Sequence, residues 1–170
     1  MKSPTEHVTR LEPRIAMREV EDVFDAEDMR LVRNQVAQYM THNNQRISRQ
    51  DQCEWYRTVY TPLRDKNAMV GFVLHKAEAP VGYGLVSRRH GVYWVSGGLV
   101  KEVRGKGEGE RLFSSLTEYV LNDLHQDAVY LDVQKDNERA IGLYQKLGYV
   151  ALDERDDLLI MGYGRPANAA

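Results

Sequence analysis

The sequence predicts a single α/β domain built on a mixed, largely antiparallel twisted sheet flanked by helices. The middle of the chain carries three strand-like runs separated by short turns, which favours antiparallel neighbours. Further on, a strand leads through a glycine-rich turn into an amphipathic helix and then into a second buried strand. A strand, helix and strand in succession favour a right-handed parallel crossover, so one parallel pair is expected inside the sheet.

Length, composition and charge narrow the class of protein. At 170 residues, with 42% hydrophobic and 28% charged residues, the chain suits one globular domain with a sizeable core. The formal net charge of -2 gives no global basic field, so we expect no nucleic-acid partner. Cys53 is the single cysteine, and no apolar run resembles a membrane span or a secretory signal. We therefore expect no membrane association and a cytoplasmic location.

The chain is expected to begin with a strand and a helix. Residues 1–13 are polar and predict a mobile leader, and Arg14–Val20 alternates in the manner of a first strand. Asp25 or a neighbour can cap the helix that follows. One apolar stripe marks that helix: Met29, Val32, Val36 and Met40. Residues 41–44 are of types that prefer turns, and they should end it.

A second helix is predicted to start at Ser48, which with Asp51 has the Ser-x-x-Asp spacing of a capping box. We expect this helix to run to about Tyr60 and to be ended by Pro62, because proline has no backbone N–H to donate inside a helix.

The three central strands are expected over residues 69–75, 81–87 and 92–100. The third of them contains Gly97 and Gly98. Glycine inside a strand indicates either a bulge or a place where another backbone comes close.

The stretch from Leu99 to Gly109 organises the C-terminal half of the chain. Glycines stand at alternate positions in it (Gly105, Gly107, Gly109), directly before a helix predicted over residues 110–124. Such a turn presents free backbone N–H groups and the positive end of a helix dipole to an anion. The spacing matches neither the dinucleotide fingerprint nor the P-loop. We expect a cradle for a phosphate or pyrophosphate.

A second stretch of strand and helix follows this turn. Ala128–Val133 predicts a buried strand, and Asn137–Gly148 predicts an amphipathic helix that stops at its glycine. Two further strands are expected over residues 149–152 and 158–163, and residues 165–170 are expected to form a frayed tail.

Two motifs resemble signatures of the GNAT (Gcn5-related) N-acetyltransferase family. The run Arg104–Gly109 has the pattern Arg-x-x-Gly-x-Gly, which is similar to that family's acyl-CoA-binding loop. The run Asn137–Tyr149 has Asn, Ala three residues later, Tyr four residues after that and a final Gly-aromatic pair, which resembles the second signature. The resemblance covers residues 92–163 well and the N-terminal half only by element order. It implies one GNAT-like domain over residues 14–164, with the central parallel strand pair splayed at the acyl-CoA site.

The resemblance implies that an acetyl group moves from acetyl-CoA, as co-substrate, to a primary amine, with no metal. The acceptor is expected to be a small molecule of the amino-sugar, amino-acid or polyamine type. A protein or peptide amine is one alternative, and a non-catalytic module that binds acyl-CoA is another. Homodimerisation is common in the family, and nothing in this sequence specifies a face for it.

Site residues follow from the same resemblance. Acyl-CoA would be bound by Gly98, Leu99, Arg104, Gly105, Lys106, Gly107, Glu108, Gly109, Asn137 and Tyr144. Tyr144 corresponds to the tyrosine that donates a proton to the departing thiolate, and a phenol that only packs against CoA is the alternative. Asn137 would bond the CoA arm, cap its own helix, or do both. The side chains of Arg104 and Lys106 would either contact phosphates or lie on the surface.

No motif specifies the general base. The candidates near strand ends are His75, His90, Tyr93, Ser96 and Asp132, and a water-mediated base is equally compatible. Acceptor identity is expected to reside in the turn His42–Ile47, in the second helix and in the acidic corner Asp153–Asp157. Those carboxylates would favour a cationic amine, unless the corner is only a solvated turn.

Overall fold

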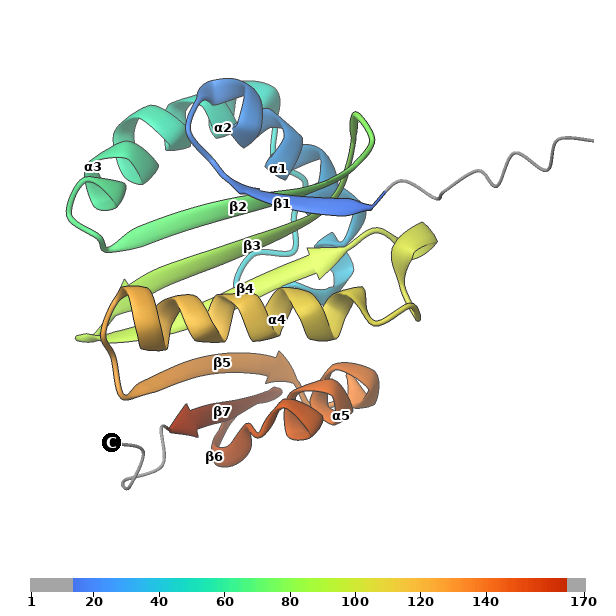
Figure 1. Ribbon diagram of the computed structural model, residues 1–170, viewed down its shortest axis with the longest axis vertical. Helices are drawn as coiled ribbons and strands as arrows, with labels where there is room; N and C mark the ends of the chain where they lie inside the picture. The colour runs from blue at the N-terminus through green and yellow to red at the C-terminus, as the bar shows by residue number, and fades with distance from the viewer. Residues whose placement is uncertain (1–13, 165–170) are drawn as a thin grey trace, which may run out of the picture.

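A mixed sheet forms the framework of the protein (Figure 1). The computed structural model describes residues 14–164; the predicted leader (1–13) and tail (165–170) lie outside the described residues. Within residues 14–164 the strands form a seven-stranded sheet in the order β1-β2-β3-β4-β5-β7-β6. The strands are β1 Ile15–Glu19, β2 Met69–Lys76, β3 Ala79–Arg89, β4 Val92–Leu99, β5 Ala128–Gln134, β6 Val150–Arg155 and β7 Leu158–Gly164. β4 and β5 are parallel and every other neighbouring pair is antiparallel, which confirms the predicted fold class.

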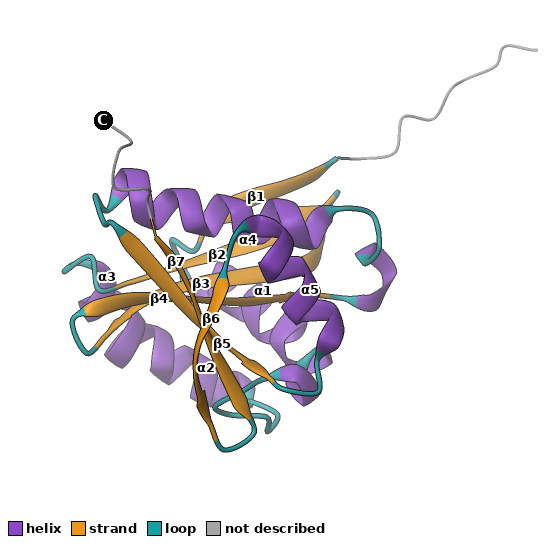
Figure 2. Cartoon of the chain, turned by 90° about the horizontal axis from the view of Figure 1, so that it is seen from below, coloured by secondary structure: helices purple, strands orange, loops and turns teal. Residues whose placement is uncertain are grey.

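Helices cover both faces of this sheet (Figure 2). They are α1 Val23–Gln35, α2 Arg49–Trp55, α3 Thr61–Arg64, α4 Glu108–Glu118 and α5 Glu138–Leu147. A Cβ atom built on Gly71 of β2 would meet Met29 of α1, and one built on Gly84 of β3 would meet Leu116 of α4. Gly84 lies opposite Phe72, the neighbour of Gly71, so these two glycines face opposite sides. α1 therefore packs on one face and α4 on the other.

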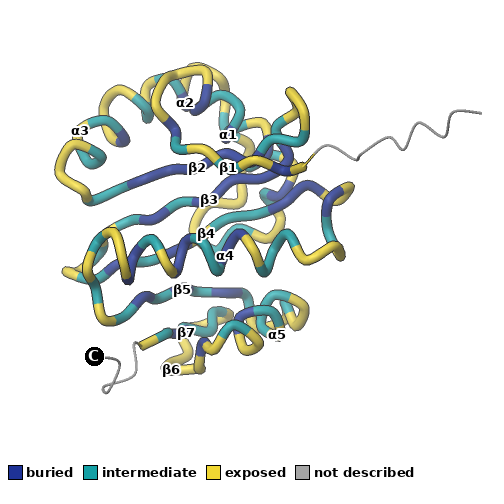
Figure 3. The backbone as a smooth tube through the Cα atoms, viewed as in Figure 1, coloured by how far each residue is buried: buried dark blue, intermediate teal, exposed yellow. Residues whose placement is uncertain are grey.

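The core lies between the sheet and these helices, and Figure 3 shows buried backbone along the central strands with exposed backbone at edge strand β6. Side chains that are almost fully buried come from strands and helices alike: Tyr60, Tyr149, Leu112, Leu116, Leu131 and Met161. None of the helices in the described part of the chain combines the length and the apolar character needed to cross a membrane.

The first two predicted helices form with changed ends. Asp22, a neighbour of Asp25, caps α1 by accepting hydrogen bonds from two backbone N–H groups, each at 2.9 Å. Ser48 caps α2, as the capping box predicted. The prediction that Pro62 ends the second helix is wrong, because α2 continues through a π-helical turn into α3. Pro62 stands in the first turn of α3, directly after the π-helical turn Tyr56–Tyr60.

Two other boundaries differ from the predictions. α4 begins at Glu108 and its last turn, Tyr119–Asp123, is π-helical. β6 extends to Arg155, past the predicted end at residue 152, because a register shift between Ala151 and Asp153 lets the strand continue along β7. The acidic corner is therefore mostly strand, and its turn is confined to residues 156–157.

The sheet is interrupted in the middle. β5 pairs with β4 only at Trp94 and Tyr130 among the described residues, although both strands continue to Leu99 and Gln134. The splay that the family resemblance implied is thus present. On its other edge β4 pairs with β3 in unbroken register from Val92 to Leu99, so the glycine pair in it makes no bulge.

Close approach explains those two glycines. A Cβ atom on Gly97 would lie 2.5 Å from the carbonyl oxygen of Tyr83, and one on Gly98 would lie 2.9 Å from Val36. Only glycine fits such distances, so the sequence sets how closely β4 packs against its neighbours.

Candidate active site

A cavity of about 580 Å³ lies where β4 and β5 separate. Its wall combines the segment after α1, the C-terminal half of β4, the glycine-rich turn, the first turns of α4, the end of β5, and α5. This volume lies within the range typical of small-molecule sites, roughly 300–1,000 Å³.

Most of the predicted CoA-binding residues line this cavity. They are Gly98, Leu99, Arg104, Gly105, Gly107, Gly109, Asn137 and Tyr144. Two do not. Lys106 is exposed and lines no part of it, and Glu108 turns toward Arg111, whose Nη1 lies 3.3 Å from its carboxylate.

The glycine-rich turn has the backbone geometry of an anion cradle. Gly105 and Gly107 adopt φ angles of +75° and +82°, a region that side-chain-bearing residues avoid. Gly107 is the N-cap of α4, and no side chain caps this helix end. Its first backbone N–H groups are therefore left for a ligand. Apart from the neighbouring residues in the chain, no atom of residues 14–164 lies within 4 Å of the position of a Cβ on either glycine, so the approach to the turn is open.

The side chain of Arg104, at the start of this turn, contacts two neighbouring segments. Its Nε donates a 2.9 Å hydrogen bond to the carbonyl oxygen of Leu99, and its guanidinium lies 5.0 Å from the ring centre of Tyr39. The side chain thus links the end of β4 to the segment after α1 and forms part of the cavity wall.

α5 supplies Asn137 and Tyr144. The side-chain oxygen of Asn137 accepts a 3.2 Å hydrogen bond from the N–H of Ala140, so this residue caps α5. Tyr144 is buried with its ring edge-on to Phe113, and their centroids are 4.8 Å apart. Burial raises the pKa of the Tyr144 hydroxyl, and the neighbouring Tyr149 raises it further. The phenol is therefore protonated at neutral pH, and its hydroxyl makes no hydrogen bond to any residue among 14–164.

The five candidates for the general base differ in whether they line a cavity and which one. His75 pairs with Asp28 at 2.7 Å and does not line the large cavity, and the Tyr93 hydroxyl donates to the Asn67 carbonyl at 2.7 Å. Ser96 lines the large cavity, whereas His90 lines a smaller one. A fifth candidate, Asp132, lines both cavities.

Asp132 is held by two residues from the segment after α1. Its Oδ1 accepts a hydrogen bond from the Thr41 hydroxyl at 2.7 Å, and its Oδ2 lies 2.6 Å from Nε2 of His42. Nε2 of His42 also lies 3.1 Å from Nη1 of Arg89, so the imidazole, the guanidinium and the carboxylate meet at this point. Arg89 adds positive charge, with Nη2 3.7 Å from the same carboxylate. Two of the four lone-pair directions of the carboxylate remain free for an acceptor group.

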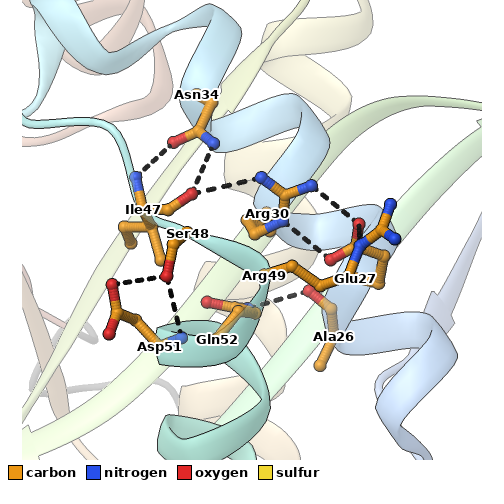
Figure 4. Close-up of polar contacts among 9 residues, drawn as sticks. All are labelled: Ala26, Glu27, Arg30, Asn34, Ile47, Ser48, Arg49, Asp51 and Gln52. Atoms are coloured by element: carbon orange, nitrogen blue, oxygen red, sulfur yellow. Dashed lines mark hydrogen bonds and ion pairs between the residues drawn. The ribbon is translucent and has the colours of Figure 1, made fainter.

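Polar contacts with α1 fix the segment that carries Thr41 and His42 (Figure 4). Asn34 exchanges two 2.9 Å hydrogen bonds with the backbone of Ile47, and Arg30 donates to the same carbonyl at 3.1 Å. Arg30 also pairs with Glu27, which holds its pKa above the ordinary value. The end of this segment at Ile47 is therefore anchored on α1.

The smaller cavity, about 220 Å³, lies on the other side of Asp132. It is lined by His42, Arg89, His90, Trp94, Asp132, Arg155, Leu158 and Ile160. Of the regions predicted to recognise the acceptor, the turn contributes His42 and the acidic corner contributes only Arg155. α2 lines neither cavity. The carboxylates of the acidic corner also line neither cavity.

Sequence reasoning missed the cluster around Asp132 because its members are far apart in the chain. His42 and Asp132 are separated by 90 positions, and no local pattern links them. Arg89 and Trp94 belong to different strands, β3 and β4, and the guanidinium lies 4.5 Å from the centre of the indole ring. Within residues 14–164 there is no group of three or more His, Cys, Asp or Glu residues placed to hold a metal ion.

Comparisons with known proteins agree with this geometry. A model of the acetyltransferase (GNAT) family matches residues 29–149. Among curated proteins, the chain is similar to YobR, an uncharacterised N-acetyltransferase of Bacillus subtilis (strain 168), at 33% identity over 84 residues. That match covers 49% of this chain and 34% of YobR, so the chain spans about a third of the length of this relative.

Solved structures share the fold. They include the ribosomal-protein-S5-alanine acetyltransferase of Vibrio fischeri (TM-score 0.75, 15% identity, 90% of this chain and 94% of that one). YncA of Salmonella typhimurium, solved with acetyl-CoA, gives a TM-score of 0.73 at 17% identity, and the match covers 92% of this chain and 96% of that one. Spermidine N-acetyltransferase of Vibrio cholerae, solved with CoA and spermine, gives a TM-score of 0.74 at 20% identity, and the match covers 89% of this chain and 95% of that one. Since the family model spans every element around the large cavity, the chain belongs to the GNAT family of acetyltransferases.

Proposed function

We propose that the protein is an acetyl-CoA-dependent N-acetyltransferase that acts on the primary amine of a small molecule. One observation carries the proposal: a single cavity joins the open glycine-rich turn to both Tyr144 and Asp132. Family membership and the shared fold support the same activity. The cytoplasmic location and the homodimer remain predictions.

The residues present fit a thioester of CoA. The uncapped start of α4, with Gly105 and Gly107, would hold the pyrophosphate through backbone N–H groups. The edges of β4 and β5 beyond Trp94 do not pair with each other, so their backbone groups are left for the extended arm of the ligand. Leu99 and Leu143 give this part of the cavity an apolar wall.

The chemistry divides between two residues that face the same cavity. When bound, acetyl-CoA supplies a thioester carbonyl to the acceptor. Asp132 would accept a proton from the acceptor ammonium, so that the nitrogen lone pair forms the new N–C bond. As the C–S bond breaks, Tyr144 would donate its phenolic proton to the sulfur, which leaves as the thiol. His42, half-exposed beside Asp132, gives the carboxylate a route for passing the gained proton to solvent.

A small acceptor is favoured over a protein amine by the cavity that Asp132 shares. At about 220 Å³ it offers the space of about seven water molecules, which suits the head group of a small molecule. A protein side chain would need a longer, open groove leading to Asp132.

Binding and turnover test the proposal separately. At a hundredfold excess over its dissociation constant, acetyl-CoA should stabilise the folded chain by about 2.7 kcal/mol, which corresponds to a rise in Tm of about 5–10 °C. Thiol release should then follow the addition of an amine. If neither acetyl-CoA, CoA nor a longer acyl-CoA raises Tm, the cradle assignment is wrong. Stabilisation without turnover of any amine would identify a non-catalytic acyl-CoA-binding module.

A further inference from the structure

Two side chains that line the smaller cavity each carry a buried hydrogen-bond donor with no partner among the described residues, Nε of Arg89 and Nε1 of Trp94. A buried donor left unpaired destabilises the fold. Both side chains line the cavity, and they stack, with the guanidinium 4.5 Å from the indole centre. Nη1 and Nη2 of Arg89 face His42 and Asp132 at 3.1 and 3.7 Å, so Nε is the guanidinium donor left unpaired. Together with the indole N–H, it suits the two oxygens of a carboxylate.

Two arginines line this cavity, Arg89 and Arg155, and Asp132 is the single carboxylate among its lining residues. Arg155 lies 3.6 Å from Asp153, but that carboxylate does not line the cavity. A second ammonium group placed here would meet like charge, which disfavours a polyamine. An anionic group would be attracted.

The strand register gives the order of the unpaired donors, Asp132 and the large cavity along β4 and β5. Trp94 stands at the point where β4 and β5 last pair, and Ser96 and Gly98 follow on the same face of β4, along the large cavity. Asp132 lies two residues beyond Tyr130, the partner of Trp94, on the corresponding face of β5. The unpaired donors therefore lie on one side of Asp132, and the large cavity with Tyr144 lies on the other.

We propose that the acceptor is a small amine that also carries a carboxylate, of the amino-acid type, with its carboxylate on Arg89 and Trp94. Its ammonium group then meets Asp132, which faces both the carboxylate site and the large cavity. This inference rests on the proposed acetyltransferase activity and names its substrate class. It differs from the cationic acceptor that the acidic corner suggested.

The test uses the full chain and a panel of acceptors: the common L-amino acids, β-alanine, glucosamine and spermidine. Binding is measured by titration calorimetry on protein saturated with CoA, and acetylation by thiol release with acetyl-CoA. We expect one or more of the amino acids to bind and to be acetylated with a kcat/KM at least tenfold above that of spermidine.

Three variants locate the carboxylate. Trp94→Phe keeps the ring and removes only its N–H, and Arg89→Met removes the fork; each should weaken amino-acid binding about tenfold or more. Arg88→Gln is the matched control, because Arg88 is the exposed neighbour on β3 and lines neither cavity. Acetyl-CoA affinity should be the same in all three variants as in the parent.

The results separate this inference from the activity on which it rests. If acetyl-CoA binds and spermidine or glucosamine is the preferred acceptor, the acetyltransferase proposal stands and the carboxylate site is wrong. The same holds if an amino acid is acetylated but Trp94→Phe and Arg89→Met change its affinity no more than Arg88→Gln does. If acetyl-CoA itself fails to bind, the proposed function fails first.

Discussion

Replacing Tyr144 by Phe deletes one hydroxyl that makes no hydrogen bond within residues 14–164. Because no protein bond is lost and the ring contact with Phe113 is kept, the free energy of unfolding should stay within about 0.5 kcal/mol of the parent, or rise. If the hydroxyl donates the proton to the leaving sulfur, kcat should fall about 10²–10⁴-fold. The dissociation constant of acetyl-CoA should not change.

Tyr149→Phe is the matched control. The Thr117 hydroxyl donates to the Phe113 carbonyl at 2.7 Å, so in the 2.6 Å contact between Tyr149 and Thr117 it is Tyr149 that donates. Losing that bond should cost about 1 kcal/mol, or about 2–4 °C in Tm, with kcat unchanged. Steady-state kinetics and thermal melts on both variants measure the contrast. A kcat for Tyr144→Phe within a factor of about three of the parent would refute its role as an acid.

Three further outcomes are expected. Gly107→Val, at a φ of +82°, should weaken acetyl-CoA binding by at least about tenfold in calorimetry. Gly91→Val, equally strained at +81° but outside the lining of the large cavity, should not. Asp132→Asn should lower kcat about a hundredfold without changing acetyl-CoA affinity. An unchanged kcat would mean that Asp132 is not the general base. Burial raises the pKa of Tyr60, Tyr83 and Tyr149 to about 12, so between pH 10 and 12 the folded chain holds protons that the unfolded chain has released. Stability should therefore be lost as pH rises through this window, by about 1.4 kcal/mol per pH unit for each residue, and ultraviolet titration should show late tyrosine ionisation only at unfolding.

The parts of the site that the sequence predicted are those that local geometry determines. The glycine-rich turn and the capped helix after Asn137 are each specified within a dozen residues, because left-handed glycines and caps are local devices. The pairing of His42 with Asp132 depends on how α1 packs on the sheet, and the hydrophobic periodicity of the sequence does not predict that packing. The same limit applies to the acidic corner, where composition suggested a negative field. The strand register instead brings Arg155, and none of the carboxylates, to the cavity.

The single rung between β4 and β5 has a mechanical consequence. Strands β1 to β4 form one half of the sheet and strands β5, β7 and β6 form the other. Within residues 14–164, the Trp94–Tyr130 pair is the only strand pairing that joins the two halves. The angle between the two halves of the sheet is therefore held by side-chain packing, such as that of Phe113 on Tyr144, more than by backbone hydrogen bonds. A ligand that pairs with both free edges would act as the missing strand. Amide hydrogens along the gap should then exchange slowly only when it is present, and the two halves of the molecule would stiffen together.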